Sequence, residues 1–216
     1  MARTQDFDTA EVVGRARDLF WDKGFESTSI PDLERATGLN RSSLYNAFTS
    51  KRGLFDAAVD DYLDRVVRPR LRILTDEPTR HDAAARYYRS LANVLASLSV
   101  DAPSRGCLLL NSAAGFAAHD DTQRAVVNAY QRELTRALTH ALRAHDPEAS
   151  TATLSHRARL LTSLSVSALL LSRVDRDEAV AVVNTAIEQL VEWNPLPADA
   201  SALPLQSSTS ANSPGE

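Results

Sequence analysis

Side chains that could read nucleic acid gather in one short segment, residues 41–48. On a helix, which turns by about 100° per residue, Leu44 and Phe48 would share one side and face inward. The other positions would present small or hydrogen-bonding side chains, outward or on the flank: Arg41, Ser42, Ser43, Tyr45 and Asn46. A narrow polar face of this kind can enter the major groove of DNA and hydrogen-bond to base edges. The segment is therefore a candidate recognition helix.

The charge around this segment has the sign that DNA requires. The whole chain is acidic, with a formal net charge of −4, which disfavours a generic polyanion binder. Residues 35–53 nevertheless hold four cations and no acid: Arg35, Arg41, Lys51 and Arg52. Cations at a helix start, such as Lys51, are unfavourable by roughly 0.3–1 kcal/mol unless a phosphate docks there. Solvated surface charge would produce the same pattern, so charge alone leaves both interpretations open.

The sequence does not support other kinds of site chemistry. No two of the seven glycines lie within six residues of each other, so neither a dinucleotide fingerprint nor a P-loop can be written. The single cysteine, Cys107, excludes an internal disulfide and a thiolate metal cluster. The five histidines form no pair at the spacing of helical metal ligands. We therefore expect no enzyme, no cofactor and no metal site.

The elements that must position residues 41–48 are all helices. Capping residues, glycine stops and apolar residues at helical spacing predict a helix over 9–23, with Asp8 and Glu11 as a capping box. A short second helix begins at Thr28 or Ser29, and a fourth begins at Thr49 or Ser50. Further helices are expected at about 81–98, 106–118, 122–145, 152–173 and 176–193. No alternating β-branched run suggests a sheet, so the expected fold class is all-α.

Pro69 and Pro78 mark the expected boundary between two domains. Residues 1–68 would form a three-helix helix-turn-helix domain, and residues 69–194 a second helical domain. Residues 195–216, rich in Pro, Ser and Ala, are expected to be a disordered tail. The N-terminus lacks a signal peptide pattern, and no apolar stretch is long enough to span a bilayer. The sequence therefore predicts a cytoplasmic protein without a membrane partner.

Residues 8–65 resemble the tetracycline-repressor (TetR) family of transcription regulators. The resemblance is carried by the spacing and type of fourteen residues: Phe20, Gly24, Thr28, Ile30, Leu33, Ala36, Gly38, Leu39, Leu44, Tyr45, Phe48, Lys51, Leu54 and Phe55. It implies a DNA-binding domain made of the first three helices and the start of the fourth. The helical domain that follows would bind a small-molecule effector and form a homodimer.

The resemblance also implies which residues contact DNA. Bases would be contacted by Arg41, Ser42, Ser43 and Asn46. Phosphates would be contacted by Thr28 or Ser29, by Tyr45 and by Lys51. The chain departs from the family pattern at Pro31, where relatives often have a polar residue, and at Ala47, where an aromatic residue or histidine is common. Base readout would then depend more on Arg41.

The effector pocket should combine a few polar groups with an apolar wall. Candidates on or beside apolar helices are Tyr88, Asn111, Ser112, Phe116 and His119, with Tyr87 and Tyr130 next to them. Each of them could equally be an ordinary core or surface residue, and Cys107 could be either inert packing or a redox sensor. For the dimer, helices 152–173 and 176–193 carry apolar stripes that could pair with a second copy or pack on their own domain.

Taken together, these features predict a dimeric, ligand-responsive transcriptional repressor. It would bind a palindromic double-stranded DNA operator through a helix-turn-helix and be released by a small molecule. The alternative is a helical small-molecule carrier or bundle protein without specific DNA binding. A weaker rival is a constitutive activator that binds no ligand.

Overall fold

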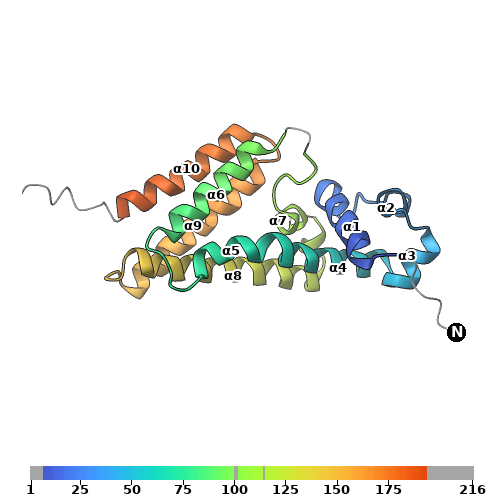
Figure 1. Cartoon of the computed structure of the whole chain (residues 1–216), viewed down its shortest axis with the longest axis horizontal. Helices are drawn as coiled ribbons and strands as arrows, with labels where there is room; N and C mark the ends of the chain where they lie inside the picture. The colour runs from blue at the N-terminus through green and yellow to red at the C-terminus, as the bar shows by residue number, and fades with distance from the viewer. Residues whose placement is uncertain (1–6, 100–101, 114, 194–216) are drawn as a thin grey trace, which may run out of the picture.

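The computed structural model describes residues 7–99, 102–113 and 115–193. Within these ranges the chain forms helices and no strand, which confirms the all-α fold class. The molecule is elongated, with the first helices at one end and the end of α10 (Arg176–Trp193) at the other (Figure 1). The predicted tail, residues 195–216, lies outside the described residues. In the part that is described, no helix is both long and apolar enough to cross a bilayer.

Four helices make up the N-terminal bundle: α1 (Thr9–Lys23), α2 (Ile30–Thr37), α3 (Arg41–Phe48) and α4 (Lys51–Tyr62). The predicted bounds of the first and third helices are confirmed. Of the alternative caps, Ser29 begins α2 and Ser50 begins α4, each accepting from a backbone N–H three residues on. The Asp8 side chain caps α1, but Glu11 does not complete the capping box, because its carboxylate pairs with Arg15 instead.

The chain does not break at Pro69. After α4 it continues through a π-helical turn, η1 (Leu63–Val67), directly into α5 (Arg68–Thr75). The expected domain boundary at Pro69 therefore does not coincide with the end of a helix. A π-turn directly precedes Pro69: the backbone N–H of Arg68 donates to the Leu63 carbonyl five residues back, so the helical run passes this proline through a local π-bulge. The proposed boundary between residues 68 and 69 falls inside this continuous helical run.

The rest of the chain forms a helical body: α6 (Ala83–Ser97), α7 (Leu108–Ala113), the 3₁₀ turn η2 (Phe116–Ala118), α8 (Asp121–His145), α9 (Thr151–Leu171) and α10. The bounds predicted for α6, α8, α9 and α10 hold to within two residues. The single helix predicted over 106–118 is wrong, since the structure has α7 and η2 there. Gly106 has a left-handed φ of 79°, and Gly115 has φ −101° and ψ −94°, so neither continues a helix.

One continuous apolar core joins the bundle to the body. It runs from Phe20 and Phe55 through Tyr62 and Leu74 to Leu134 and the buried side of α9. In the body, α10 packs on α6 and α9, and α8 packs on α9 and along α5. Figure 1 shows α4 and α5 as one long rod that leads from the bundle into the body. The recognition segment is therefore mechanically connected to the body and not suspended on a flexible linker.

Candidate nucleic-acid interface

α3 presents the polar face that the sequence predicts. Leu44 is buried, at 4% exposure, and Phe48 is half-buried against the core. The exposed side chains of α3 are Arg41, Ser42, Tyr45 and Asn46. Ser43 is half-buried, so it lies less openly than its neighbours. The predicted buried and exposed sides of α3 are thus confirmed, while the contacts of these residues with bases stay predictions.

A tight turn fixes α3 against α2. Gly38 ends α2 in the left-handed region, with φ 75°, a conformation that glycine adopts without steric cost. The Asn40 side chain then accepts from the backbone N–H of Ser43 at 2.9 Å and caps α3. From α2, the Glu34 carboxylate accepts from the backbone N–H of Arg41 at 2.6 Å. These contacts hold the start of α3 in a defined orientation.

The two alternatives for a phosphate contact at the start of α2 differ in exposure. Thr28 is 1% exposed, and its hydroxyl donates to the carbonyl of Gly24 at 2.6 Å. Ser29 is exposed, and its hydroxyl donates to Asp32 at 2.8 Å. Hydrogen bonds from Ser29 hold the pKa of the Asp32 carboxyl well below its usual range. Ser29 is therefore exposed with its hydroxyl paired to Asp32, whereas Thr28 is buried.

The four cations of residues 35–53 have unequal partners. Arg35 pairs with Asp32, and Arg52 donates to Asp56 at 2.7 Å and to Asp120 at 2.5 Å. Within the described part of the chain, Arg41 and Lys51 form no ion pair; the Arg41 guanidinium lies 5.4 Å from the centre of the exposed Tyr45 ring. Among these four cations, the positive charge that no nearby carboxylate balances therefore belongs to Arg41 and Lys51.

Lys51 sits at the start of α4 on an aromatic ring. Its ammonium lies 4.4 Å from the centre of the Phe25 ring, and the side chain is half-buried. Partial burial lowers the pKa of Lys51, and the charge of Glu26 opposes that shift. A nearby phosphate would favour the charged form, so this environment suits a lysine that receives an anion.

The predicted effector residues do not form one site. Tyr88 is fully buried between α6 and α9, and its hydroxyl donates to the Leu161 carbonyl at 2.7 Å. The Ser112 hydroxyl donates to Leu109, and the Asn111 amide donates to Trp21 and Arg105 carbonyls. Phe116 packs toward the bundle and His119 is exposed. These side chains serve the interior and the surface of the chain in different places.

A contact that sequence reasoning missed joins the body to the bundle, and we call it the aromatic junction: Phe25, Arg52, Phe55, Phe116 and Asp120. The Phe116 ring stacks on Phe25 with centroids 4.1 Å apart, and Arg52 lies 4.9 Å from the Phe116 centroid. The hydrogen bond to Asp120 is the main cause that raises the pKa of Arg52. Because the ion pair joins residues 68 positions apart, local sequence patterns could not reveal it.

A second contact between the same two parts involves Arg173, which follows α9. Its guanidinium donates to the carbonyls of Trp21 at 3.3 Å and Asp22 at 2.9 Å, at the end of α1. A cation at this position satisfies carbonyls that have no partner within the helix.

Across the described residues, no group of three or more His, Cys, Asp or Glu side chains is arranged to hold a metal ion.

Comparison with known proteins agrees with this geometry. Residues 13–58 match the family model described as "Bacterial regulatory proteins, tetR family". The chain is 37% identical over 111 residues to the HTH-type transcriptional repressor ComR of Escherichia coli (strain K12), a match that spans 51% of each chain. It is 29% identical over 181 residues to the HTH-type transcriptional regulator YezE of Bacillus subtilis (strain 168), covering 82% of this chain and 92% of YezE.

A solved structure extends the similarity to nearly the whole fold. A cysteine mutant of the TetR family transcriptional regulator CifR, complexed with a 26-base-pair double-stranded operator DNA, is 28% identical. The match covers 86% of this chain and 98% of CifR, with a TM-score of 0.73. All three proteins are described as transcriptional regulators, ComR and YezE as HTH-type and CifR as a member of the TetR family. Residues 13–58 therefore form a domain of the TetR family type, and the comparisons support a TetR family transcriptional regulator, not an enzyme.

Proposed function

We propose that this protein is a cytoplasmic, homodimeric repressor that binds a palindromic operator and is released by a small molecule. The observation that carries the proposal is the exposed polar face of α3, held by the turn at Gly38 and the contact from Glu34. An α-helix of this kind fits the major groove of B-DNA. The operator complex of CifR, a protein with the same fold, supports this use of α3.

The proposed contacts with DNA follow from exposure and charge. Arg41, Ser42 and Asn46 contact bases, with half-buried Ser43 at the edge of the same face. Three exposed or half-buried groups around them contact phosphates: Ser29, Tyr45 and Lys51. Thr28 is left out of this set because its hydroxyl is buried and donates to Gly24.

The proposed dimer interface is the outer face of α9 and α10. Leu160, Leu170, Val174 and Val191 are the exposed large aliphatic side chains of the described residues, with Val174 at 87% and Val191 at 60% exposure. Most of the predicted stripe residues, including Leu161 and Val183, pack within the chain, and only Leu160 and Val191 of them are exposed. Exposed apolar residues on two adjacent helices are typical of a surface that pairs with a second copy. Two-fold pairing would place two α3 helices on successive major grooves.

Release by a ligand requires a physical connection between the body and α3. The rod from Lys51 to Thr75, the aromatic junction and the Arg173 contact supply three such connections. A ligand that favours a different packing of the body would change the position of α3 through them. By linkage, operator DNA must weaken ligand binding by the same factor.

The test is selection of bound sequences from a random DNA pool with the full-length protein, followed by gel shifts on the selected sequence. We expect a palindromic consensus bound far more tightly than scrambled DNA, with a strong dependence on salt concentration. Equal affinity for every duplex would contradict the proposal and favour the carrier alternative. An activator would bind the same consensus, and transcription from a promoter carrying it would distinguish the two signs of regulation.

A further inference from the structure

A groove runs between α5 and α8 on the surface of the body. It has a volume of about 530 Å³, within the roughly 300–1,000 Å³ of small-molecule sites. Each helix contributes residues at the spacing of one helical face: Arg68, Leu71, Arg72 and Thr75 from α5, and Glu133, Arg136, Ala137 and His140 from α8. We call it the α5–α8 groove.

The α5–α8 groove has an apolar floor and charged edges. Leu71 and Ala137 are buried, at 6% and 4% exposure, whereas the arginines and His140 are exposed. The segment after α5 holds His140 in place: its Nε2 atom lies 2.7 Å from the Thr79 hydroxyl and 3.2 Å from the Glu77 carboxylate. The groove therefore offers apolar surface at its base and positive charge on both walls.

The arginines of the groove are poorly balanced by acids. Arg68 pairs with Asp64 of the preceding turn, but the guanidinium groups of Arg72 and Arg136 form no ion pair or hydrogen bond with any residue that the structure describes. Among the described lining residues one is acidic, the half-buried Glu133. The whole chain has a net charge of −4, so this excess of positive charge is local.

A second hollow, on the other side of α8, shares Arg136. It lies between α8 and α9 and has a volume of about 340 Å³. Its described lining residues include three arginines and no acid: Gln131, Arg132, Thr135, Arg136, Thr139 and Arg159. Arg132 and Arg136 are four positions apart on α8, where like charges repel each other. These neighbours raise the positive potential at Arg136, which favours a ligand with more than one negative charge.

We propose that the α5–α8 groove is the effector site and that the effector is an organic anion with at least two negatively charged groups. This inference rests on the proposed function and names its ligand class and binding site. A guanidinium group matches a carboxylate or a phosphate with two parallel hydrogen bonds. Arg72 and Arg136 stand on opposite walls, so each takes one anionic group. The part of the ligand that joins the two groups lies over Leu71 and Ala137.

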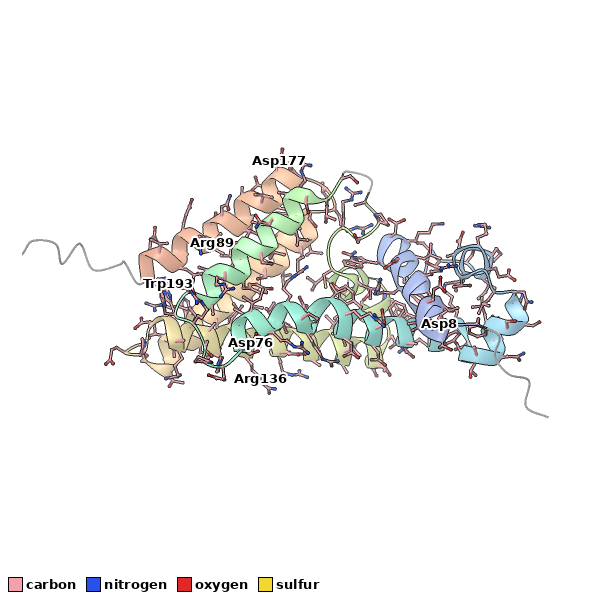
Figure 2. All side chains as sticks on the ribbon, in the orientation of Figure 1. Asp8, Asp76, Arg89, Arg136, Asp177 and Trp193 are labelled. Atoms are coloured by element: carbon pink, nitrogen blue, oxygen red, sulfur yellow. The ribbon has the colours of Figure 1, made fainter. Side chains whose placement is uncertain are left out.

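The competing location is a hollow over α6. It has a volume of about 600 Å³ and contains Arg86 and Arg89, which also form no ion pair in the described part of the chain. All of its described lining residues belong to α6, however, so it lacks the second wall that the α5–α8 groove has. Figure 2 shows Arg89 and Arg136 on different sides of the body. Variants at these two positions can therefore distinguish the two locations.

Binding in the α5–α8 groove also accounts for release from DNA. α5 is the far end of the rod that begins at Lys51, next to α3. α8 begins beside Asp120, whose carboxylate accepts from Arg52 in α4. A ligand held between α5 and α8 thus acts on two elements that both reach the bundle. It releases the operator if it binds the DNA-free conformation more tightly than the DNA-bound one.

The experiment uses the full-length protein and matched probes of different charge. Terephthalate is compared with benzoate, adenosine diphosphate with adenosine, and inorganic phosphate is tested alone. Calorimetry and thermal unfolding should show that terephthalate or adenosine diphosphate binds and raises Tm. The less charged partner should bind about 10- to 100-fold more weakly, as for loss of a charge-assisted hydrogen bond. The preferred member of the two pairs identifies the anionic group as a carboxylate or a phosphate.

Two results of this comparison would overturn the inference. One is that neither terephthalate nor adenosine diphosphate binds. The other is that benzoate, adenosine or inorganic phosphate binds as tightly as the organic anions with more charge, because the site would then not recognise two anionic groups on one molecule.

Variants locate the site. Arg72→Gln and Arg136→Gln should each weaken the best anion by about 10- to 100-fold. Glu133→Gln removes the acid of the groove and should strengthen binding. Arg89→Gln is the matched control, since Arg89 is an exposed arginine without an ion pair in the described residues, and it should leave the affinity unchanged. Unchanged affinity in both Arg72→Gln and Arg136→Gln, or a loss in Arg89→Gln, would contradict the assignment.

Gel shifts separate this inference from the proposed function. If the protein binds its operator but none of the anions, the effector class is wrong and the DNA-binding function stands. If an anion binds through Arg72 and Arg136 but the protein binds no operator, the groove is a binding site and the proposed function fails. We expect the anion to release the wild-type protein from DNA and to leave Arg136→Gln bound. An anion that binds in the groove without releasing the operator is not the effector.

Discussion

Arg41 and Lys51 are the two cations near α3 that form no ion pair within the described residues, and their surroundings differ. Arg41 is exposed on the outward face of α3, where a guanidinium can reach two acceptors of one guanine. Lys51 is half-buried over Phe25 at the start of α4, where its ammonium is predicted to meet a phosphate. We therefore expect these residues to contribute to affinity in different ways.

Arg41→Ala should cost about 1–3 kcal/mol of operator binding and relax the preference at one base position. Competition gel shifts with single-base operator variants measure both effects. Arg35→Ala is the control, because Arg35 is exposed but paired with Asp32, and it should change affinity little. An equal loss of affinity for every sequence in Arg41→Ala would show that Arg41 contacts phosphates only.

Lys51 should take up a proton when DNA binds at alkaline pH. Its pKa is lowered from the ordinary 10.5 in the free protein, and a phosphate would raise it again. Between these two pKa values the free protein has lost part of the proton that the complex retains. Calorimetry of operator binding at several alkaline pH values below 10.5, in two buffers of different ionisation enthalpy, measures the uptake.

Lys51→Arg is the matched control for that uptake, because arginine stays charged at this pH. It should bind the operator with less proton uptake than the wild type. If the two proteins take up equal numbers of protons, Lys51 is not next to a phosphate in the complex.

At the scale of elements, the position of α3 depends on how closely it approaches α4. A Cβ at Gly53, in the first turn of α4, would lie 2.2 Å from the backbone oxygen of Phe48, the last residue of α3. Backbone atoms cannot move aside as a flexible side chain can. The glycine is thus required by the junction of the two helices and not by its own φ.

Gly53→Ala should displace α3 from α4, lower the free energy of unfolding by about 1–3 kcal/mol as overpacking does, and weaken operator binding. Gly14→Ala is the opposite case, because a Cβ at Gly14 in α1 meets nothing within 4 Å. It should stabilise the protein by about 0.5–1 kcal/mol. Urea unfolding and gel shifts of both variants check the pair; a stabilising Gly53→Ala would refute the close approach.

The bounds of the helices could largely be predicted from the sequence, whereas contacts between distant segments could not. Caps and glycine stops act over three or four residues, so Ser29, Asn40 and Gly38 predict the bounds of α2 and α3 closely. The π-turn that carries Pro69 inside a helix, and the ion pair of Arg52 with Asp120, depend on packing between distant segments. Local patterns contain no signal for such partners.

At the scale of the whole molecule, the exposed aliphatic residues predict self-association. α10 runs from near Asp177 to Trp193 along the outer edge of the body, while the labelled Arg136 lies on the far side of α8 (Figure 2). Val191→Glu places a charge on the proposed interface, so it should shift the protein toward monomer and reduce operator affinity. Sedimentation velocity and gel shifts measure these effects.

Ala129→Glu is the control for that prediction, since Ala129 is exposed on α8 and outside the proposed interface. It should leave both the oligomeric state and operator binding as in the wild type. A Val191→Glu protein that remains a dimer of normal stability would place the interface on another face.

The uninterrupted run from Lys51 to Thr75 has a geometric consequence for regulation. At 1.5 Å per residue it is roughly 37 Å long, and it acts as a lever with the recognition helix attached to one tip. A pivot of about 5° at the opposite tip moves the recognition helix by about 3 Å, close to the 3.4 Å step between base pairs. A rotation too small to disturb the core would therefore be enough to misalign the recognition helix with the base pairs of an operator.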